Sequence, residues 1–192
     1  MNDLTIFVKD MKMKVFFFGY SVSLIFLVIG CATLPEPGTA HDTLVIGMII
    51  HTGKDFHTYS HVSVNGVHRT GIEMKLKNIT TNDEYSVKTE KNGLFYTVAL
   101  PPGTYRIDQF YLKVSSGSAW ADTYYSPGNL TFTIVKGKIN NLGMINWDGR
   151  MGGDTNVQLS QLYNYVENEF RTQFSGSGWL KRDMTNQNIT KK

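Results

Sequence analysis

The sequence predicts a mainly β protein, an antiparallel β-sandwich followed by one C-terminal amphipathic α-helix. Three observations lead to this prediction. Short runs of alternating apolar and polar residues recur between residues 72 and 147. Glycine, proline and asparagine separate these runs, as they do at the turns of a sandwich. From residue 159 the apolar residues recur at three- and four-residue steps, which is the period of a helix.

The first predicted strand opens the domain, which we expect to span residues 43–150. Leu44–Ile50 is apolar at every position. Such a run is typical of a strand that is buried on both faces or lies in the middle of a sheet.

Strict alternation begins at Ile72. Apolar residues and charged residues take opposite faces over 72–77, and the same rule holds over 85–89. Asn92-Gly93 supplies two residues that accept positive φ, which predicts a tight hairpin between 85–89 and a partner strand over 94–100.

Pro101-Pro102-Gly103 predicts the next reversal of the chain, because proline presets φ and glycine accepts the left-handed region. The strand that leaves this turn is expected over 104–112. Further strands are expected over 119–124, 130–135 and 139–147.

Four of these motifs lie between Gly71 and Tyr105, and together this stretch resembles the carboxypeptidase regulatory-like, or transthyretin-like, β-sandwich family. They are two motif strands, an Asn-Gly-aromatic turn and a Leu-Pro-Pro-Gly-x-Tyr corner, found here at Ile72–Asn78, Glu84–Thr89, Asn92–Phe95 and Leu100–Tyr105. The resemblance implies an Ig-like sandwich that serves as a noncatalytic accessory, adhesive or assembly module. Asp55–Thr70 replaces the short lead-in of that family and is expected to be an insertion or a long loop.

The predicted helix lies within residues 151–180. Asp154 is the expected N-cap, or Thr155 together with Gln158 forms a capping box, and glycines at 176–178 end the helix. We expect its apolar face to pack on the sandwich; binding to a partner or to a membrane is the alternative. That face comprises Leu159, Leu162, Val166, Phe170 and Phe174. Residues 181–192 are polar and predicted to be disordered.

Cys31, the only cysteine, follows the apolar segment Val15–Gly30. This segment follows a lysine-containing stretch and is shorter than the roughly 20 residues that span a bilayer. The pattern is typical of a cleaved signal peptide. The start of translation is left open among Met1, Met11 and Met13, because Asp3 and Asp10 are unusual in the basic part of an export signal.

Val28-Ile29-Gly30-Cys31 resembles the lipobox of bacterial lipoproteins. The resemblance implies that residues 1–30 are removed and that Cys31 becomes an acylated N-terminus, attached to a membrane through lipid. Ala32 after the cysteine implies the outer membrane if the host has two. An uncleaved signal anchor and a secretory signal with an incidental cysteine are the alternatives. Residues 31–42 contain two prolines and are expected to be a tether.

The formal net charge of +3 is small for 192 residues. Basic residues cluster only in the short pairs Lys181-Arg182 and Lys191-Lys192, so nucleic acid is not an expected partner. An envelope protein or polymer is the expected partner.

The sequence contains neither a Gly-x-Ser-x-Gly nor a His-Glu-x-x-His motif. Lipidation would also consume the only thiol. We therefore expect a noncatalytic protein without a cofactor; the alternative is a hydrolase whose dispersed site uses His57 or His61 with Asp55.

All five histidines fall between His41 and His68. His51, His57 and His61 are weak candidates for metal ligands. Four residues along a strand span about 13 Å, which is too far for two histidines to share one ion. Solvated loop histidines are the favoured interpretation, and no metal site is predicted.

Two further stretches are candidates for binding. Gly149–Asp154 is a glycine-rich entry to the predicted helix, but it lacks the spacing and the lysine of a phosphate-binding loop, which favours a structural turn. Trp120, Tyr124 and Tyr125 lie in a stretch, 120–128, that we expect to be exposed. They are weak candidates for a sugar- or peptide-binding surface, with core packing as the alternative.

Overall fold

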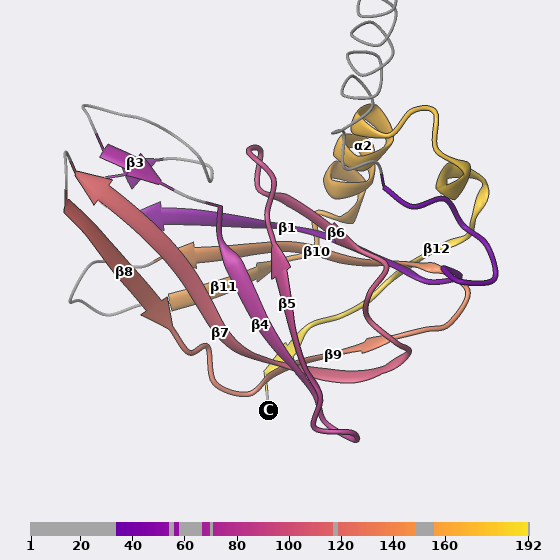
Figure 1. The fold of residues 1–192 in the computed structure, drawn as a ribbon, viewed down its shortest axis with the longest axis horizontal. Helices are drawn as coiled ribbons and strands as arrows, with labels where there is room; N and C mark the ends of the chain where they lie inside the picture. Colours follow the sequence, from indigo (N-terminus) through magenta and orange to yellow (C-terminus); the bar gives the residue numbers. More distant parts are fainter. Residues whose placement is uncertain are drawn as a thin grey trace, which may run out of the picture. The chain divides into compact units, whose positions relative to one another are not determined.

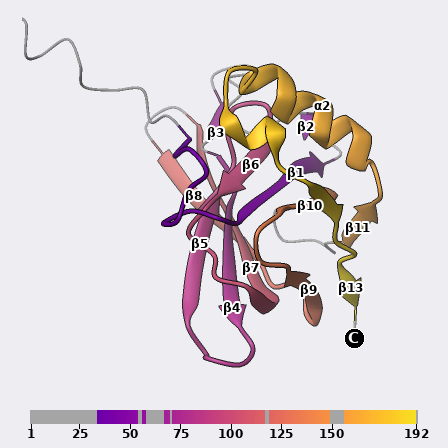
Figure 2. The ribbon, with the colours of Figure 1, turned by 90° about the vertical axis from the view of Figure 1, so that its right-hand side faces the viewer.

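The computed structural model describes residues 34–53, 56–57, 67–69, 71–116, 119–148 and 156–191. The strands and helices belong to one compact unit, Pro35–Lys192. Two β-sheets face each other in this unit (Figures 1 and 2). The mainly β fold with a C-terminal helix, predicted from the sequence, is thereby confirmed.

The first sheet, sheet A, is mixed rather than antiparallel. Its order is β11-β10-β1-β2, with β6 beside β1 and β12 beside β10. Strands β1 and β10 are parallel, with Leu44 opposite Ile139. Because the two strands are far apart in sequence, the residue pattern of either strand does not predict that it pairs with the other. The strands are β1 (Leu44–Gly53), β2 (Phe56–His57), β6 (Leu94–Thr97), β10 (Ile139–Asp148), β11 (Asn156–Ser160) and β12 (Met184–Asn186).

The second sheet, sheet B, is antiparallel throughout. Its order is β13-β9-β7-β4-β5, and β3 and β8 also pair with β7. The long strand β7 therefore organises the sheet. The strands are β3 (Val67–Arg69), β4 (Glu73–Asn78), β5 (Glu84–Lys88), β7 (Gly103–Ser116), β8 (Ala119–Tyr125), β9 (Leu130–Ile134) and β13 (Thr190–Lys191).

The core lies between the two sheets. Trp147 of β10 is fully buried, and its ring stacks near Phe110 and Tyr125 of sheet B, with centroids 5.8 Å and 6.1 Å away. The alternation predicted over 72–77 is confirmed, because the apolar residues of this run are buried. Those residues are Ile72, Met74 and Leu76.

The hairpin predicted around Asn92-Gly93 is wrong in its pairing. The turn exists, with Gly93 at φ +85° and its N–H donating to Glu90 O at 3.0 Å. However, β5 pairs with β4 in sheet B, whereas β6 pairs with β1 in sheet A. The turn therefore carries the chain from one sheet to the other. Leu94 and Phe95 are both buried, since β6 contacts both the core and the helix that covers sheet A.

The turn at Pro101-Pro102-Gly103 leads into β7 as predicted. The hydroxyl of the buried Tyr105 donates to Pro101 O at 2.7 Å and fastens this corner. The expected strands over 119–124, 130–135 and 139–147 correspond to β8, β9 and β10.

The helix begins later than predicted. Residues Asn156–Ser160 form β11, which pairs with β10, and α2 spans Tyr163–Gln173. The edge of β10 offers unpaired backbone groups, and pairing with them overrides the helical period of the sequence. Val166 and Phe170 are buried against sheet A as predicted, whereas Leu159 and Leu162, assigned to the same face, are 39% and 49% exposed. The proposed caps Asp154 and Thr155 lie outside the described residues.

The C-terminal segment 181–192 was expected to be disordered, and the structure corrects this. It contains β12, which pairs with β10, and β13, which pairs with β9. Hydrogen bonds hold it: Gln187 Nε2 donates to Asn140 Oδ1 at 3.0 Å, and Gln187 N donates to Asn141 O at 2.8 Å. Ile189 also packs against the core. A polar composition does not reveal contacts of this kind.

The expected tether also differs from the structure. Pro35 and Glu36 accept hydrogen bonds from the short 3-10 helix η2 (Gly178–Lys181). At the other end of the segment, Asp42 forms an ion pair with Lys136 at 3.8 Å. Residues 35–42 are thus attached to the folded unit rather than forming a tether. Leu34 is buried, and residues 31–33 lie outside the described residues.

Candidate functional site on the outer face of sheet B

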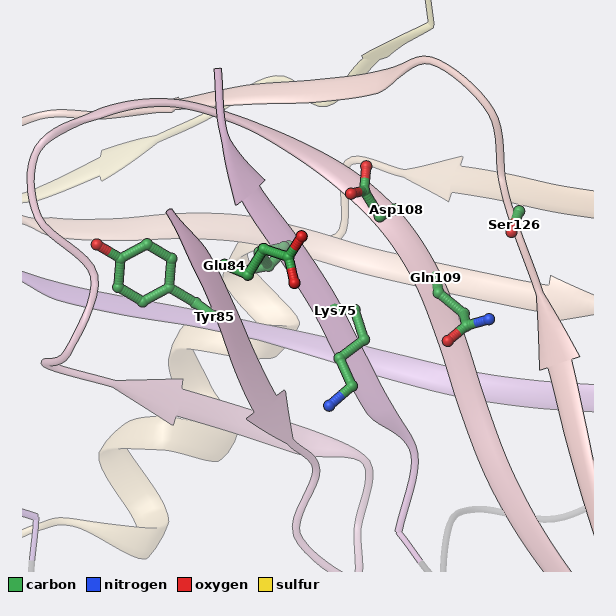
Figure 3. A pocket seen from close by; sticks show the side chains of 7 residues that line it. Lys75, Glu84, Tyr85, Asp108, Gln109 and Ser126 are labelled. Carbon is green, nitrogen blue, oxygen red and sulfur yellow. The ribbon is translucent and has the colours of Figure 1, made fainter. Parts of the chain in front are cut away.

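A polar pocket of about 360 Å³ opens on the face of sheet B that points away from the core (Figure 3). Its lining comes from β4, β5, β7 and the residue after β8. We refer to it as the sheet-B pocket, and it is lined by Lys75, Leu76, Glu84, Tyr85, Asp108, Gln109 and Ser126.

A β-bulge shapes this pocket. Lys75 lies opposite Gln109, but the next residue, Leu76, lies opposite Ile107, so Asp108 is an extra residue in β7. Ile107 is fully buried, whereas Asp108 and Gln109 are both partly exposed. A bulge redirects side chains. Two consecutive polar residues therefore line the sheet-B pocket.

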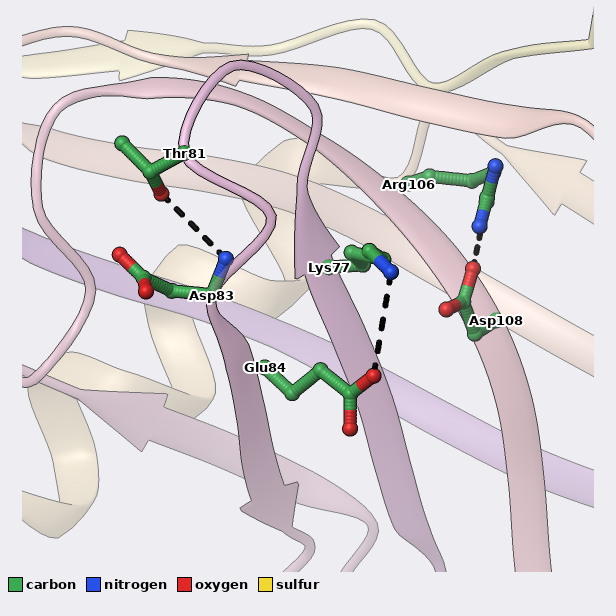
Figure 4. Close-up of polar contacts among 6 residues, drawn as sticks. All are labelled: Lys77, Thr81, Asp83, Glu84, Arg106 and Asp108. Carbon is green, nitrogen blue, oxygen red and sulfur yellow. Dashed lines mark hydrogen bonds and ion pairs between the residues drawn. The ribbon is translucent and has the colours of Figure 1, made fainter.

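Ion pairs border the pocket (Figure 4). Arg106 Nε lies 2.5 Å from Asp108 Oδ1, and Lys77 Nζ lies 3.9 Å from Glu84 Oε1. Pairs this exposed add little stability. Their effect is to present charges of both signs, together with the Gln109 amide, to a ligand. Such a lining suits a ligand rich in hydrogen-bonding groups better than one with a strong net charge.

Glu73, two residues before Lys75 on β4, holds the Lys75 side chain in place. Its carboxylate pairs with Lys75 and with Lys88, the latter at 3.6 Å, and accepts a hydrogen bond from Ser86 Oγ at 2.5 Å. Partial burial raises the pKa of Glu73, but the hydrogen bonds from Lys75 and Ser86 and the two ammonium charges outweigh it, so the pKa lies below its ordinary value. Glu73 is therefore ionised at neutral pH, and its ion pair with Lys75 positions that side chain beside the pocket.

Two tyrosines continue this face. Tyr111 of β7 and Tyr124 of β8 are paired in register, with ring centroids 5.0 Å apart and planes tilted by 38°. Tyr124 is 56% exposed. Because Tyr111 follows Gln109 by two residues on the same strand, the aromatic pair lies on the pocket's side of the sheet.

The stretch 120–128, expected to be exposed, comprises most of the strand β8 and the three residues after it. Tyr124 is exposed as expected, but Tyr125 points to the core and stacks near Trp147. Strand alternation explains this opposite placement. The backbone of Trp120 pairs with Ser115, and its side chain lies outside the described residues.

The histidines separate in the structure. His51 is buried, with its ring 4.6 Å from that of Trp147 in an edge-on contact. His57 lies in β2 opposite Thr52, and His61 lies outside the described residues. Within the described parts of the chain, no three His, Cys, Asp or Glu side chains come together as metal ligands do. Cys31 also lies outside them.

No sequence motif marks the pocket residues, because each one is an ordinary polar residue of a strand face. One signal was present in the chain. Ile107 and Phe110 are buried three residues apart, with Asp108-Gln109 between them, which breaks the period of two. Such a break in an alternating run indicates a bulge.

Comparisons with known proteins identify no relatives by sequence. No family model matches the chain, and no curated protein matches it. Among solved structures, a leucine-rich repeat protein from Bacteroides thetaiotaomicron is similar over 68% of this chain, with 14% sequence identity and a TM-score of 0.31. This chain spans 15% of the length of that protein. No helix in the described residues has the length and apolar character needed to span a membrane.

Proposed function

We propose that the protein is a lipid-anchored, noncatalytic lipoprotein of the bacterial cell envelope whose β domain binds a protein or polymer there. The observation that carries the proposal is the position of Cys31, directly after an apolar export segment and four residues before the folded unit begins at Pro35. An acylated cysteine at this place would attach the domain to a membrane.

The sheet-B pocket supports a binding role. Its two carboxylates, Glu84 and Asp108, face the cations Lys77 and Arg106 rather than a nucleophile. Groups paired in this way orient a polar ligand by hydrogen bonds, and acid–base or nucleophilic chemistry needs other neighbours.

The domain is proposed to be a variant of the carboxypeptidase regulatory-like sandwich. The Leu100–Tyr105 corner supports this, since Tyr105 turns back to bond Pro101 O at 2.7 Å. Binding and assembly roles in that family accord with the proposal, although one fold serves many functions.

We expect Cys31→Ser to abolish acylation. The wild-type protein, purified from its own membranes, should have an intact mass that corresponds to a chain starting at Cys31 plus acyl groups, and it should partition into detergent. The variant should lose both properties because the sulfur that carries the lipid is gone. Wild-type protein recovered without acyl groups, or at full length in the membrane, would contradict the proposal.

Carbohydrate is a second candidate ligand, and the Tyr111–Tyr124 pair is the observation that favours it. An exposed aromatic face beside hydrogen-bonding side chains offers both the apolar and the polar contacts that a sugar ring makes. On this reading the polymer bound in the envelope would be a polysaccharide.

Replacement of Tyr124 by alanine should then weaken binding to isolated envelope polysaccharide roughly tenfold, as the loss of one aromatic contact of about 1.5 kcal/mol implies. The measurement is the Kd by calorimetry or by sedimentation with the polymer. Tyr165→Ala is the matched control, because Tyr165 is 43% exposed but lies on α2. Equal affinities for both variants and the wild type would exclude this face as a carbohydrate site.

A further inference from the structure

Hydrogen bonds between residues 35–36 and residues 178–179 fix where the folded domain starts. Trp179 Nε1 donates to Pro35 O at 2.6 Å, and Gly178 N donates to Glu36 Oε2 at 2.6 Å. Trp179 is fully buried. We call these four residues the N-terminal clamp. The hydrogen bond to the Glu36 carboxylate is charge-assisted, and such bonds are among the stronger ones in proteins.

The clamp leaves little room for change at Gly178. A Cβ atom there would lie 2.6 Å from Glu36 Oε2 and 3.3 Å from Pro37 Cδ. The segment that follows is held as well, since Gly137 N donates to Thr43 Oγ1 at 3.0 Å beside the Asp42–Lys136 pair. The chain from Pro35 to Thr43 is therefore fastened at both of its ends.

This fastening limits the reach of a lipid anchor. Three residues lie between Cys31 and Pro35, and the four residue-to-residue steps from Cys31 to Pro35 span at most about 14 Å when fully extended. A free tether up to Asp42 would reach about 40 Å. If Cys31 is acylated, η2 is consequently held close to the surface of the bilayer.

Two exposed cations at this end can attract anionic lipid headgroups, and an exposed carboxylate, Asp183, follows them. Lys181 and Arg182 follow Trp179 after one intervening residue, Leu180, and are both exposed. The backbone N–H of Arg182 donates to Trp179 O at 2.9 Å, so the basic pair is attached to the clamp itself. Basic residues next to a lipid anchor add electrostatic attraction to anionic membranes.

The opposite end of the molecule carries the loop between β4 and β5. Figures 1 and 2 share a vertical axis, and in both views α2 and the yellow-gold turn of η2 lie at the top while this loop lies at the bottom. Lys77 and Glu84, which border the sheet-B pocket, are located at the base of the loop (Figure 4).

We propose that the η2 end of the domain, with Lys181 and Arg182, lies against the anionic headgroups of the bilayer that holds the acylated Cys31. The β4–β5 loop and the adjoining border of the sheet-B pocket then point away from the membrane, toward the rest of the envelope. The proposal rests on the lipid anchor proposed above.

The test uses the acylated protein, purified from membranes and reconstituted into vesicles of phosphatidylethanolamine and phosphatidylglycerol with a nitroxide on some headgroups. Acylation blocks Cys31, so Asp183→Cys and Thr81→Cys each introduce a single free thiol for a fluorophore. Asp183 is exposed beside the basic pair, and Thr81 lies in the β4–β5 loop. We expect strong quenching at position 183 and little at position 81.

Two further variants separate the contributions. Glu36→Ala combined with Trp179→Phe removes both hydrogen bonds of the clamp and should reduce the contrast between the two positions. Replacement of Lys181 and Arg182 by glutamine, with the clamp intact, should lower the population of the headgroup-facing orientation on the order of tenfold. Circular dichroism of each variant would verify that the sheets are intact.

The possible outcomes are distinguishable. A protein whose mass shows no acyl group would overturn the proposed function, before any question of orientation. An acylated protein that shows equal quenching at positions 81 and 183 would overturn the proposed orientation and leave the anchor standing. A contrast that persists unchanged in the glutamine variant would overturn the role of the basic pair.

Discussion

Replacement of Trp147 by alanine should lower the free energy of unfolding by about 3–5 kcal/mol. Trp147 belongs to sheet A, and the rings near it at Phe110 and Tyr125 belong to sheet B, so its side chain joins the two sheets. It is 0% exposed. Truncation would remove these contacts and leave a cavity that the surrounding strands fill only in part. Urea denaturation would show a lower midpoint with a similar slope.

Tyr124→Ala is the matched control for this measurement. Tyr124 is a large aromatic residue of a strand as well, but it lies on the outer face and is 56% exposed. Its replacement should change the free energy of unfolding by no more than about 0.5 kcal/mol. Similar losses in the two variants would show that Trp147 is not the centre of the core.

Asn140→Ala should cost about 2–3 kcal/mol, which is large for a polar residue. Asn140 is 0% exposed, and its amide bonds both backbone groups of Val135, at 2.8 Å and 2.9 Å. It also accepts from Gln187 Nε2 at 3.0 Å. Alanine would leave these groups without their partner and detach the C-terminal segment from β10.

Two measurements would check this second prediction. Urea denaturation gives the total loss, and hydrogen exchange should be faster in residues 184–191, which Gln187 helps to hold. Asn186→Ala is the control, because Asn186 lies in the same segment but is exposed. An effect of Asn140→Ala no larger than that of the control would contradict the role assigned to the buried amide.

Much of the fold could be predicted from patterns among residues that are neighbours in the sequence. The alternation of Ile72, Met74 and Leu76 with charged residues defines which face of β4 is buried, because hydrophobic burial acts on each side chain where it stands. The Pro101–Gly103 turn likewise follows from φ preferences that are local to those residues.

The predictions from the sequence were wrong where pairing between distant strands overrides the conformational preference of a segment. Leu159 fits a helical period, yet it lies in β11, which pairs with the edge of β10. Asn92-Gly93 forms its turn, but the strand after it pairs with β1 rather than with β5. Hydrogen bonds between distant strands are nearly independent of side chains, so no pattern within one segment reveals them.

The sheet-B pocket shows the same division. Tyr124 was a candidate for a binding surface because it is aromatic. Lys75, Glu84 and Asp108, in contrast, meet only because β4, β5 and β7 lie side by side. Tyr125, a candidate for the same reason as Tyr124, is turned to the core by the register of β8. Proximity of this kind is a property of the assembled sheet.

The sequence by itself determined the strand-rich character of the chain and most strand positions, since these depend on the chemistry of neighbouring residues. Only the tertiary structure decided that β1 and β10 are parallel, that a bulge opens a polar pocket, and that Trp179 holds Pro35 at the start of the domain. Each of these depends on contacts between segments far apart in the chain, whose free energy exists only once both segments are in place.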